Sequence, residues 1–256
     1  MDKINGYPRG DRILSATLNG SREAEWVELL QKRLGRNSLG LIERSELAEA
    51  YQRTQIFRRG QTIVDHADGQ SLHILIEGWA ARTNILEDGS QQITDIILPG
   101  DFCDLSRLTG GTSMRAVAIT SGRVALLDRK ALLGVIERQP KLGLALIRLA
   151  LSEQSILREW LTCTGRRDKR QHLAHLLCEL HQRLRQVGLA DGDEFDFPLT
   201  QSQLADATGM TPIYVNRLLQ GLRDKGILSL EQHYLSIHEP RRLREIGGFS
   251  GSYLAD

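Results

Sequence analysis

"LTQSQLADATGMTPIYVNRLLQGLRDKGIL", residues 199–228, contains two short helical patterns separated by a glycine. Thr200 and Gln203 have the spacing of a capping box, in which the hydroxyl and the amide each satisfy an otherwise unpaired backbone N–H. Gly209 suits the turn, because a residue without Cβ adopts positive φ most easily. The stretch therefore predicts a helix over "QSQLADAT", a tight turn and a second helix.

The second helix is predicted to begin after Thr211, which is an N-cap candidate. Pro212 then occupies the first helical position, where the missing N–H of proline costs nothing. Helical spacing places Val215, Leu218 and Leu222 on the side that faces the core. The opposite side of this helix is left open to a partner.

Two short helices joined in this way form a helix-turn-helix, whose second helix lies in the major groove of DNA. "GILSLEQHYLSIHEP" follows at once and indicates a two-stranded hairpin, which predicts a winged variant. We therefore expect double-stranded DNA as a partner. The candidate contact residues are Gln201, Thr211, Pro212, Ile213, Tyr214, Asn216, Arg217 and Gln220. Of these, Gln201 and Thr211 are at helix N-termini and are expected to contact phosphates.

Arg217 is the strongest candidate for reading a base, because its guanidinium fork can grip O6 and N7 of guanine. Asn216 could pair with adenine or contact a phosphate. Tyr214 could reach a phosphate or pack within its own domain. Ile213 and Pro212 offer only apolar contact, for example to a thymine methyl group.

Composition places the chain among ordinary globular proteins and leaves the DNA hypothesis to rest on motif geometry. The 256 residues include 33 basic and 32 acidic side chains, and this net charge of +1 neither suggests nor excludes a polyanionic partner. No apolar run approaches the roughly 20 residues needed to span a bilayer. The first residues lack the apolar core of a secretory signal. These features predict a cytoplasmic protein without membrane contact.

Three cysteines, Cys103, Cys163 and Cys178, are odd in number and lie far apart. Their spacing fits neither a disulfide framework nor a zinc or iron–sulfur site. We therefore expect no metal and no resident cofactor. We also expect no catalytic residues and no enzyme activity. Cys163 lies beside a predicted hinge, where it could be either a redox sensor or an inert buried thiol.

Helical patterns over 21–34 and 44–53 precede a region of short strand candidates. These strand candidates are 61–66, 72–83, 91–98, 114–120 and 123–128. Asp88-Gly89 between two alternating runs predicts a hairpin turn, because both positions tolerate positive φ. Short strands separated by glycine-containing turns predict an antiparallel β-roll of the double-stranded jelly-roll type.

The longest helical pattern, within 139–163, carries two apolar stripes. The first stripe is assigned to a dimerisation helix and consists of Leu142, Leu146, Leu149, Ile156 and Trp160, with Glu153 as a polar interruption. The second stripe consists of Leu144, Ile147, Leu151 and Leu161. A helix with two stripes must be covered twice, so one is expected on the roll and one on a second copy. A core helix of a single domain would show the same pattern.

These patterns divide an α+β chain into five parts. They are an N-terminal extension (1–36), a β-roll domain (37–138), the dimerisation helix (139–163), a winged helix-turn-helix domain (164–246) and a C-terminal tail (247–256). The extension is expected either to be disordered or to cap the roll. The glycine and charge cluster in "TCTGRRDKR", residues 162–170, predicts a hinge over Thr164–Arg167.

Taken together, the chain resembles the Crp/Fnr family of bacterial transcription regulators over about residues 45–246. The markers are "IFRRGQTIV" and "ILIEG" in the first strands, "LPGDF" after them, the long helix and the helix-turn-helix stretch. The resemblance implies a cyclic-nucleotide-binding-type β-roll, a dimerisation helix and a winged helix-turn-helix domain. It also implies a homodimer that binds palindromic promoter sites and works with RNA polymerase.

The effector region departs from the pattern of cyclic-AMP-binding members, which carry a Gly-Glu pair after the "PGDF"-like turn and an Arg-Ser pair further on. Cys103-Asp104 and Thr112-Ser113 stand at those places here. Asp104 would repel a phosphate, and the bidentate arginine is missing. Cyclic AMP is therefore not expected, and the effector is unknown. The candidate pocket residues are Gly100, Asp101, Cys103, Asp104, Thr112, Ser113 and Arg115.

Two further departures concern the recognition helix and the oxygen-sensing members. Familiar members present Arg-Glu at the start of the recognition helix and another arginine further along. Here Pro212-Ile213 replaces the first pair, while Arg217 is retained. No cysteine precedes Cys103, so the N-terminal cysteine set that carries an iron–sulfur cluster is absent.

An alternative interpretation is a metal-binding, cupin-like enzyme or sensor that uses His66, His73 and Glu77. Cupin metal sites have two closely spaced histidines, a carboxylate soon after and another histidine on a later strand. Here the two histidines are seven residues apart, and no later strand of the roll supplies one. Haem ligation by one of these histidines, and a roll that serves only as a dimer scaffold, are further alternatives.

Overall fold

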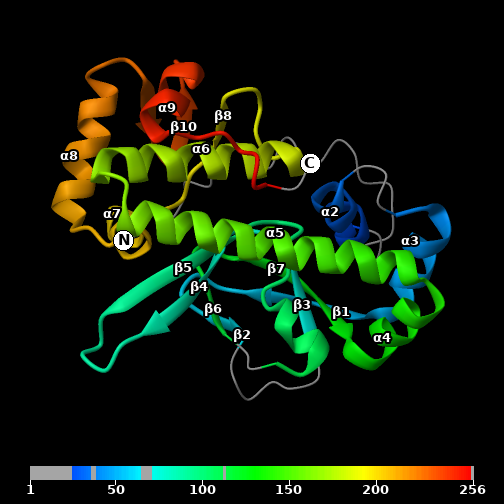
Figure 1. Ribbon diagram of the computed structural model, residues 1–256. Coiled ribbons are helices and arrows are strands. Elements are labelled where there is room, and N and C mark those ends of the chain that lie inside the picture. The colour runs from blue at the N-terminus through cyan, green and yellow to red at the C-terminus, as the bar shows by residue number, and fades with distance from the viewer. Residues whose placement is uncertain (1–24, 36–38, 65–70, 112–113, 255–256) are drawn as a thin grey trace, which may run out of the picture.

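The computed structural model describes residues 25–35, 39–64, 71–111 and 114–254. A β-roll is followed by the long helix α5, Pro140–Gly165, and then by a C-terminal domain that begins with α6, Lys169–Val187. In Figure 1, α5 lies between the strands of the roll and α6, which returns alongside it. The predicted order of β-roll, long helix and winged helix-turn-helix within an α+β fold is confirmed.

The roll consists of two antiparallel sheets, as predicted. One has three strands in the order β1-β7-β3, and the other has four in the order β2-β6-β4-β5. The strands are β1 (Tyr51–Phe57), β2 (Thr62–Val64), β3 (Ser71–Glu77), β4 (Ala80–Ile85), β5 (Gln91–Ile97), β6 (Arg115–Ala118) and β7 (Gly122–Asp128). A short 3-10 helix, η2 (Leu105–Thr109), lies between β5 and β6.

The hairpin turn predicted at Asp88-Gly89 is present between β4 and β5. Gly89 has φ of +81°, and the Asp88 carboxylate accepts a hydrogen bond from the Ser90 backbone N–H at 2.8 Å. The single strand predicted over 72–83 is wrong, because the chain turns at Gly78, where φ is +90°. A Cβ at that glycine would lie 2.7 Å from the Ser121 carbonyl oxygen, so the turn needs glycine on both grounds.

The helix predicted over 44–53 is also partly wrong. The chain forms α3 (Leu41–Leu47) and the 3-10 turn η1 (Ala48–Ala50), and then enters β1. Strand β1 pairs with β7 along its length, from Tyr51 opposite Leu127 to Phe57 opposite Gly122. This pairing satisfies the backbone groups of β1, so tertiary context overrides the local helical pattern.

Three helices cover the roll, and the first of them comes from the predicted N-terminal extension. They are α2 (Glu25–Leu34), α4 (Arg129–Arg138) and α5. Trp26 and Leu30 of α2 are completely buried against the roll and α5. This part of the extension is therefore a cap on the roll, while residues 1–24 lie outside the described residues.

The burial of α5 shows which of its two apolar stripes faces the rest of its own chain. The first stripe packs inside its own chain, since Leu142, Leu146, Leu149, Ile156 and Trp160 are all at most 7% exposed. Its assignment to a contact with a second copy is therefore wrong. The second stripe is open to solvent, and Leu157 extends it. Its exposed residues are Leu144, Ile147, Leu151, Leu157 and Leu161.

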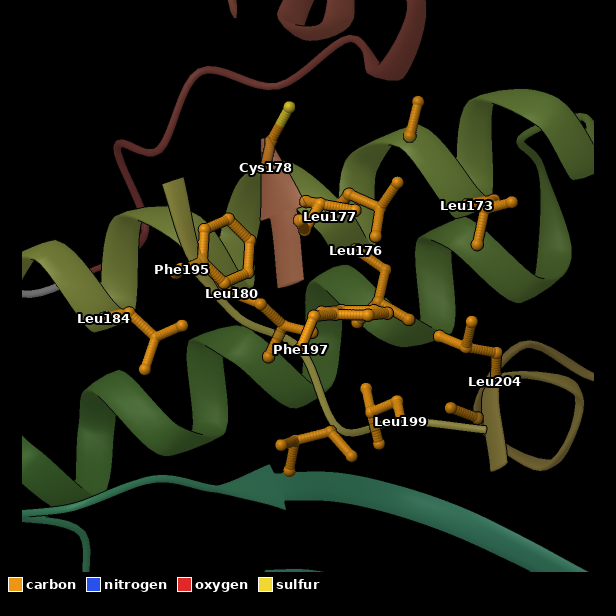
Figure 2. Close-up of a cluster of buried hydrophobic side chains, with 14 of the residues drawn as sticks. Leu173, Leu176, Leu177, Cys178, Leu180, Leu184, Phe195, Phe197, Leu199 and Leu204 are labelled. Carbon is orange, nitrogen blue, oxygen red and sulfur yellow. The ribbon is translucent and has the colours of Figure 1, made fainter. Parts of the chain in front are cut away.

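The C-terminal domain packs three helices and a small sheet against α6. Its remaining elements are β8 (Glu194–Asp196), α7 (Gln201–Thr208), α8 (Pro212–Arg223), β9 (Leu228–Glu231), β10 (Tyr234–Ile237) and α9 (Pro240–Gly247). In Figure 2, leucines along one face of α6 meet Phe195, Phe197 and Leu199. The segment assigned to a C-terminal tail also joins this core through the buried Phe249 and Leu254.

One arginine of α6 joins the C-terminal domain to the roll. Arg183 is 2% exposed, and its guanidinium donates to the Ile96 carbonyl oxygen at 2.7 Å and to Asp101 at 2.9 Å. It also lies 3.3 Å from Asp95 and 3.4 Å from Glu179. Because Ile96, Asp95 and Asp101 belong to the roll, this side chain fixes where α6 sits.

We expect Arg183→Ala to destabilise the chain by about 3–5 kcal/mol, because it leaves buried carboxylates without their partner. Urea unfolding followed by tryptophan fluorescence measures the effect. Arg185→Ala is the matched control, since Arg185 is on the same helix but exposed, and it should change stability by about 0.5 kcal/mol or less. Equal unfolding midpoints for the two variants would contradict the assignment.

Candidate nucleic-acid interface

Both caps predicted for the helix-turn-helix are present. The Thr200 hydroxyl accepts from the Gln203 backbone N–H at 3.1 Å, and the Gln203 side chain accepts from the Thr200 N–H at 2.9 Å. Gly209 ends α7 with φ of +62°. The Thr211 hydroxyl accepts from the Tyr214 N–H at 3.3 Å, and Pro212 is the first residue of α8. These local contacts set the angle between the two helices.

Helix α8 buries one side and exposes the other, and it lies at the outer edge of the domain (Figure 1). Its buried residues are Val215, Leu219 and Leu222. Leu218 is only partly buried, so its predicted place in the core is taken by Leu219, one position later. The predicted DNA contacts Gln201, Thr211, Pro212, Ile213, Tyr214, Asn216, Arg217 and Gln220 are all exposed. Their contact with DNA stays a prediction.

Four of the exposed residues contact one another in two pairs. The Gln201 side-chain amide donates to the Asn216 side-chain oxygen at 3.0 Å, which leaves the Asn216 NH2 group as its free donor. The Arg217 guanidinium carbon lies 6.0 Å from the centre of the Tyr214 ring, within the range of a cation–π contact. Asn216 and Arg217 thus present donors side by side on the open face.

Gln220 is less available than predicted. Its amide donates to Asp224 at 2.6 Å, and its amide oxygen accepts from Arg223 at 2.6 Å. The open donors of α8 therefore concentrate in its first two turns.

The predicted wing is present after α8. Strands β9 and β10 form a hairpin, and β8 pairs with β10 on the other side. Gln232 and His233 make the turn with φ of 49° and 65°. Such a two-residue turn with positive φ at both positions suits the twist of a hairpin, although neither residue is glycine.

The predicted effector-pocket residues are occupied by contacts within the chain. Asp101 pairs with Arg33 and Arg183. Burial by itself would raise the pKa of Asp101, but the charges of these two arginines hold it below the usual value. Asp104 accepts from the backbone N–H groups of Ser106 and Met114. These two carboxylates therefore stabilise the loop and offer nothing to an anionic ligand.

The other described pocket residues, Gly100, Cys103 and Arg115, also have close neighbours within the chain. Gly100, with φ of +91°, lies against α2, where a Cβ would come 2.9 Å from the Leu29 carbonyl oxygen. Burial raises the pKa of the Cys103 thiol to about 12, and the backbone N–H of Cys103 donates to the backbone carbonyl oxygen of His73 at 2.8 Å. Arg115 donates to the Thr62 hydroxyl at 3.3 Å. Thr112 and Ser113 lie outside the described residues.

Arg82 of β4 is a central residue that sequence reasoning missed. Its guanidinium donates to the carbonyl oxygens of Phe102 at 2.8 Å and Cys103 at 3.1 Å. It also pairs with Asp95 of β5 and Glu153 of α5. Burial opposes the charge of Arg82, but the charges of Glu153 and Asp95 raise its pKa. The available signal was a single arginine directly after two alanines in the strand "AARTNI".

The alternative metal site in the roll does not form from the described residues. His73 is 1% exposed and lies inside the roll. Glu77 is exposed and pairs with Arg123 at 2.6 Å. His66 lies outside the described residues. Within the described part of the chain, three potential metal ligands come together elsewhere, in Glu159, Cys163 and His175.

Comparison with known proteins gives consistent matches in both domains. Residues 171–246 match the Crp-like helix-turn-helix domain, and residues 54–139 match the cyclic nucleotide-binding domain. Transcriptional activator protein FnrL of Cereibacter sphaeroides is 29% identical over 198 residues, which cover 75% of this chain and 79% of FnrL. Nitrogen fixation regulation protein FixK of Bradyrhizobium diazoefficiens is 28% identical over 211 residues, which cover 82% of this chain and 88% of FixK.

A solved structure agrees on the fold. FixK2 from Bradyrhizobium japonicum superposes with a TM-score of 0.68 at 23% identity, covering 76% of this chain and 96% of FixK2. No helix in the described part of the chain is long and apolar enough to cross a membrane. Because the β-roll and the helix-turn-helix domain each match a family model and the relatives and the fold agree, the chain belongs to the Crp/Fnr family of transcription regulators.

Proposed function

We propose that the protein binds palindromic promoter sites as a homodimer and inserts the open face of α8 into the major groove. The observation that carries this proposal is the exposed set of donors on the first two turns of α8, held in place by Gln201 and Tyr214. The relatives FnrL and FixK are named as an activator and a regulation protein, which supports a role at promoters.

The second apolar stripe of α5 supports the homodimer. Five large apolar side chains between Leu144 and Leu161 are each more than half exposed on one helix. A second copy of α5 with the same stripe would remove them from water, as in a coiled coil. The 26 residues of α5 span about 39 Å, long enough for several turns of contact between two copies. The resulting symmetric pair would present its two α8 helices to major-groove sites one DNA turn, about 34 Å, apart.

Leu151→Glu should weaken the homodimer by tenfold or more, because it exchanges about 2 kcal/mol of apolar burial per chain for a charge. Light scattering over a dilution series measures the monomer–dimer equilibrium. Ala48→Glu introduces the same charge at an exposed position outside α5 and should leave the equilibrium unchanged. A dimer that tolerates Leu151→Glu would place the contact on another surface.

Arg217→Ala should reduce the preference for the cognate site by about 1–3 kcal/mol while changing the salt dependence of binding little. The cognate site is obtained by selection from random DNA, and affinities for it and for random duplex are compared by fluorescence anisotropy. Lys225→Ala, exposed just past α8, is the control and should keep the preference. Equal losses of Arg217→Ala on both DNAs would refute base reading.

We propose that the roll does not use cyclic AMP. Arg82 takes up the carbonyl oxygens that follow the "PGDF" turn, and Asp104 presents a carboxylate where a phosphate would have to bind. Calorimetric titration of the protein with cyclic AMP should therefore give no saturable heat. Saturable binding of one nucleotide per chain would overturn this part of the proposal.

We further propose that the regulator acts in the cytoplasm and contacts RNA polymerase there. A signal would rotate the C-terminal domains about the link between α5 and α6, where Gly165 ends one helix and Asp168 caps the next. Free energies of about 1–3 kcal/mol are enough to couple two sites in this way.

A further inference from the structure

Three side chains with metal-binding chemistry converge where α5 meets α6. Glu159 and Cys163 lie one turn apart on α5, and His175 faces them from α6. One ligand atom from each lies within 4.8 Å of the others. Ligand atoms of a tetrahedral zinc site are about 3.3–3.8 Å apart, so closing this cluster on an ion needs only small side-chain movements.

The hydrogen bonds of His175 leave the correct nitrogen free for a metal. Its Nδ1 lies 3.1 Å from the Gly247 carbonyl oxygen, which can only accept, so Nδ1 carries the proton. The lone pair is then on Nε2, which lies 3.7 Å from the Glu159 carboxylate. Metal-binding histidines are commonly oriented by such a backbone carbonyl on the other ring nitrogen.

The hydroxyl proton of Tyr253 need not bind the lone pair on His175 Nε2. The Tyr253 hydroxyl lies 2.8 Å from His175 Nε2 and 2.8 Å from the Glu179 carboxylate, and its single proton serves one of them at a time. Donation to Glu179 leaves Nε2 beside a second acceptor, the Glu159 carboxylate. Two acceptors at this distance favour a cation near them.

A cation of the chain itself already contacts this cluster. The Arg167 guanidinium donates to Cys163 Sγ at 2.8 Å and to the Glu159 carboxylate. Arg167 belongs to the short link between Gly165 and the N-cap Asp168. The positive charge of Arg167 therefore contacts two of the three ligands and also lies in the hinge between α5 and α6.

We propose that this cluster is a binding site for a zinc-class divalent metal ion, with Arg167 as the competing internal cation. The metal would take Glu159 oxygen, Cys163 sulfur and His175 Nε2, the mixed set that borderline-soft ions prefer, and would keep one position for water. On binding, the Cys163 thiol loses its proton to solvent and the Arg167 guanidinium leaves the two ligands.

This inference rests on the proposed function and names its effector class. Helix α5 carries the stripe that we assign to the dimer, whereas α6 begins the DNA-binding domain. An ion held by both helices, together with a released Arg167, changes the hinge between them. Any resulting change in DNA affinity must be matched by the same change in metal affinity.

Titration of the full-length protein with Co2+ tests the site without DNA. We expect one equivalent per chain to give the absorption band of a cobalt–thiolate bond. Cys163→Ser should abolish the band, and Cys178→Ser, at a buried thiol elsewhere on α6, should keep it. Glu159→Gln and His175→Gln should each weaken binding at least tenfold. Circular dichroism checks that each variant folds.

A substitution of Arg167 should change the affinity for Co2+ in the opposite direction. Arg167→Gln should tighten Co2+ binding severalfold by removing the competing cation, and Arg166→Gln, at an exposed neighbour, should not. A purely structural cluster would not bind more tightly when a hydrogen-bond donor is removed. The absence of the band in both the native protein and Arg167→Gln, or its persistence in Cys163→Ser, would overturn the site.

DNA binding with Zn2+ or with a chelator then tests the effector role. We expect the affinity of the native protein for its selected site to change at least fivefold, and that of Cys163→Ser to be unaffected. Tight, sequence-specific binding without any metal effect would overturn the effector role and leave the proposed function intact. Stoichiometric metal binding in a protein that selects no DNA sequence would overturn the proposed function and leave the metal site intact.

Discussion

The placement of the DNA-binding domain depends on one buried guanidinium. Removing Arg183 from water is costly, and the structure compensates with a carbonyl oxygen and carboxylates that belong to the roll. Around this contact the apolar core is continuous, since Trp79 of the roll meets Phe197 of the C-terminal domain edge to face at 6.3 Å. Helix α6 therefore cannot leave the roll without exposing apolar surface and leaving buried charges unpaired.

The same network supports our proposal that the roll does not bind cyclic AMP. Asp95 is shared between Arg183 and Arg82, and Arg82 continues the network to Glu153 on α5. The polar groups around the "PGDF" turn are thus used to hold the roll, α5 and α6 together. In this arrangement a nucleotide would have to replace interactions on which the domain placement depends, and a signal is better received elsewhere.

The parts of the fold that could be predicted from sequence are those set by neighbouring residues. The Thr200–Gln203 box, the turn at Gly209 and the open face of α8 follow from short-range spacing. Tertiary pairing decides β1 and the inward stripe of α5, and the sequence analysis errs there. The Arg183 network and the trio of Glu159, Cys163 and His175 join distant segments, so no spacing rule could reveal them.

Helix α5 links these features mechanically. Its inward stripe is fixed to the roll, its outward stripe is free for a second copy, and its last two turns carry Glu159 and Cys163. Leu157 and Leu161 of the outward stripe lie on the same turns of α5 as Glu159, on the other side of the helix. Because a helix transmits displacement along its length, a change of cation at this end would reach the dimer contact and the hinge together. Reorienting α8 through this hinge would also have to change the Arg183 contacts that hold α6 on the roll.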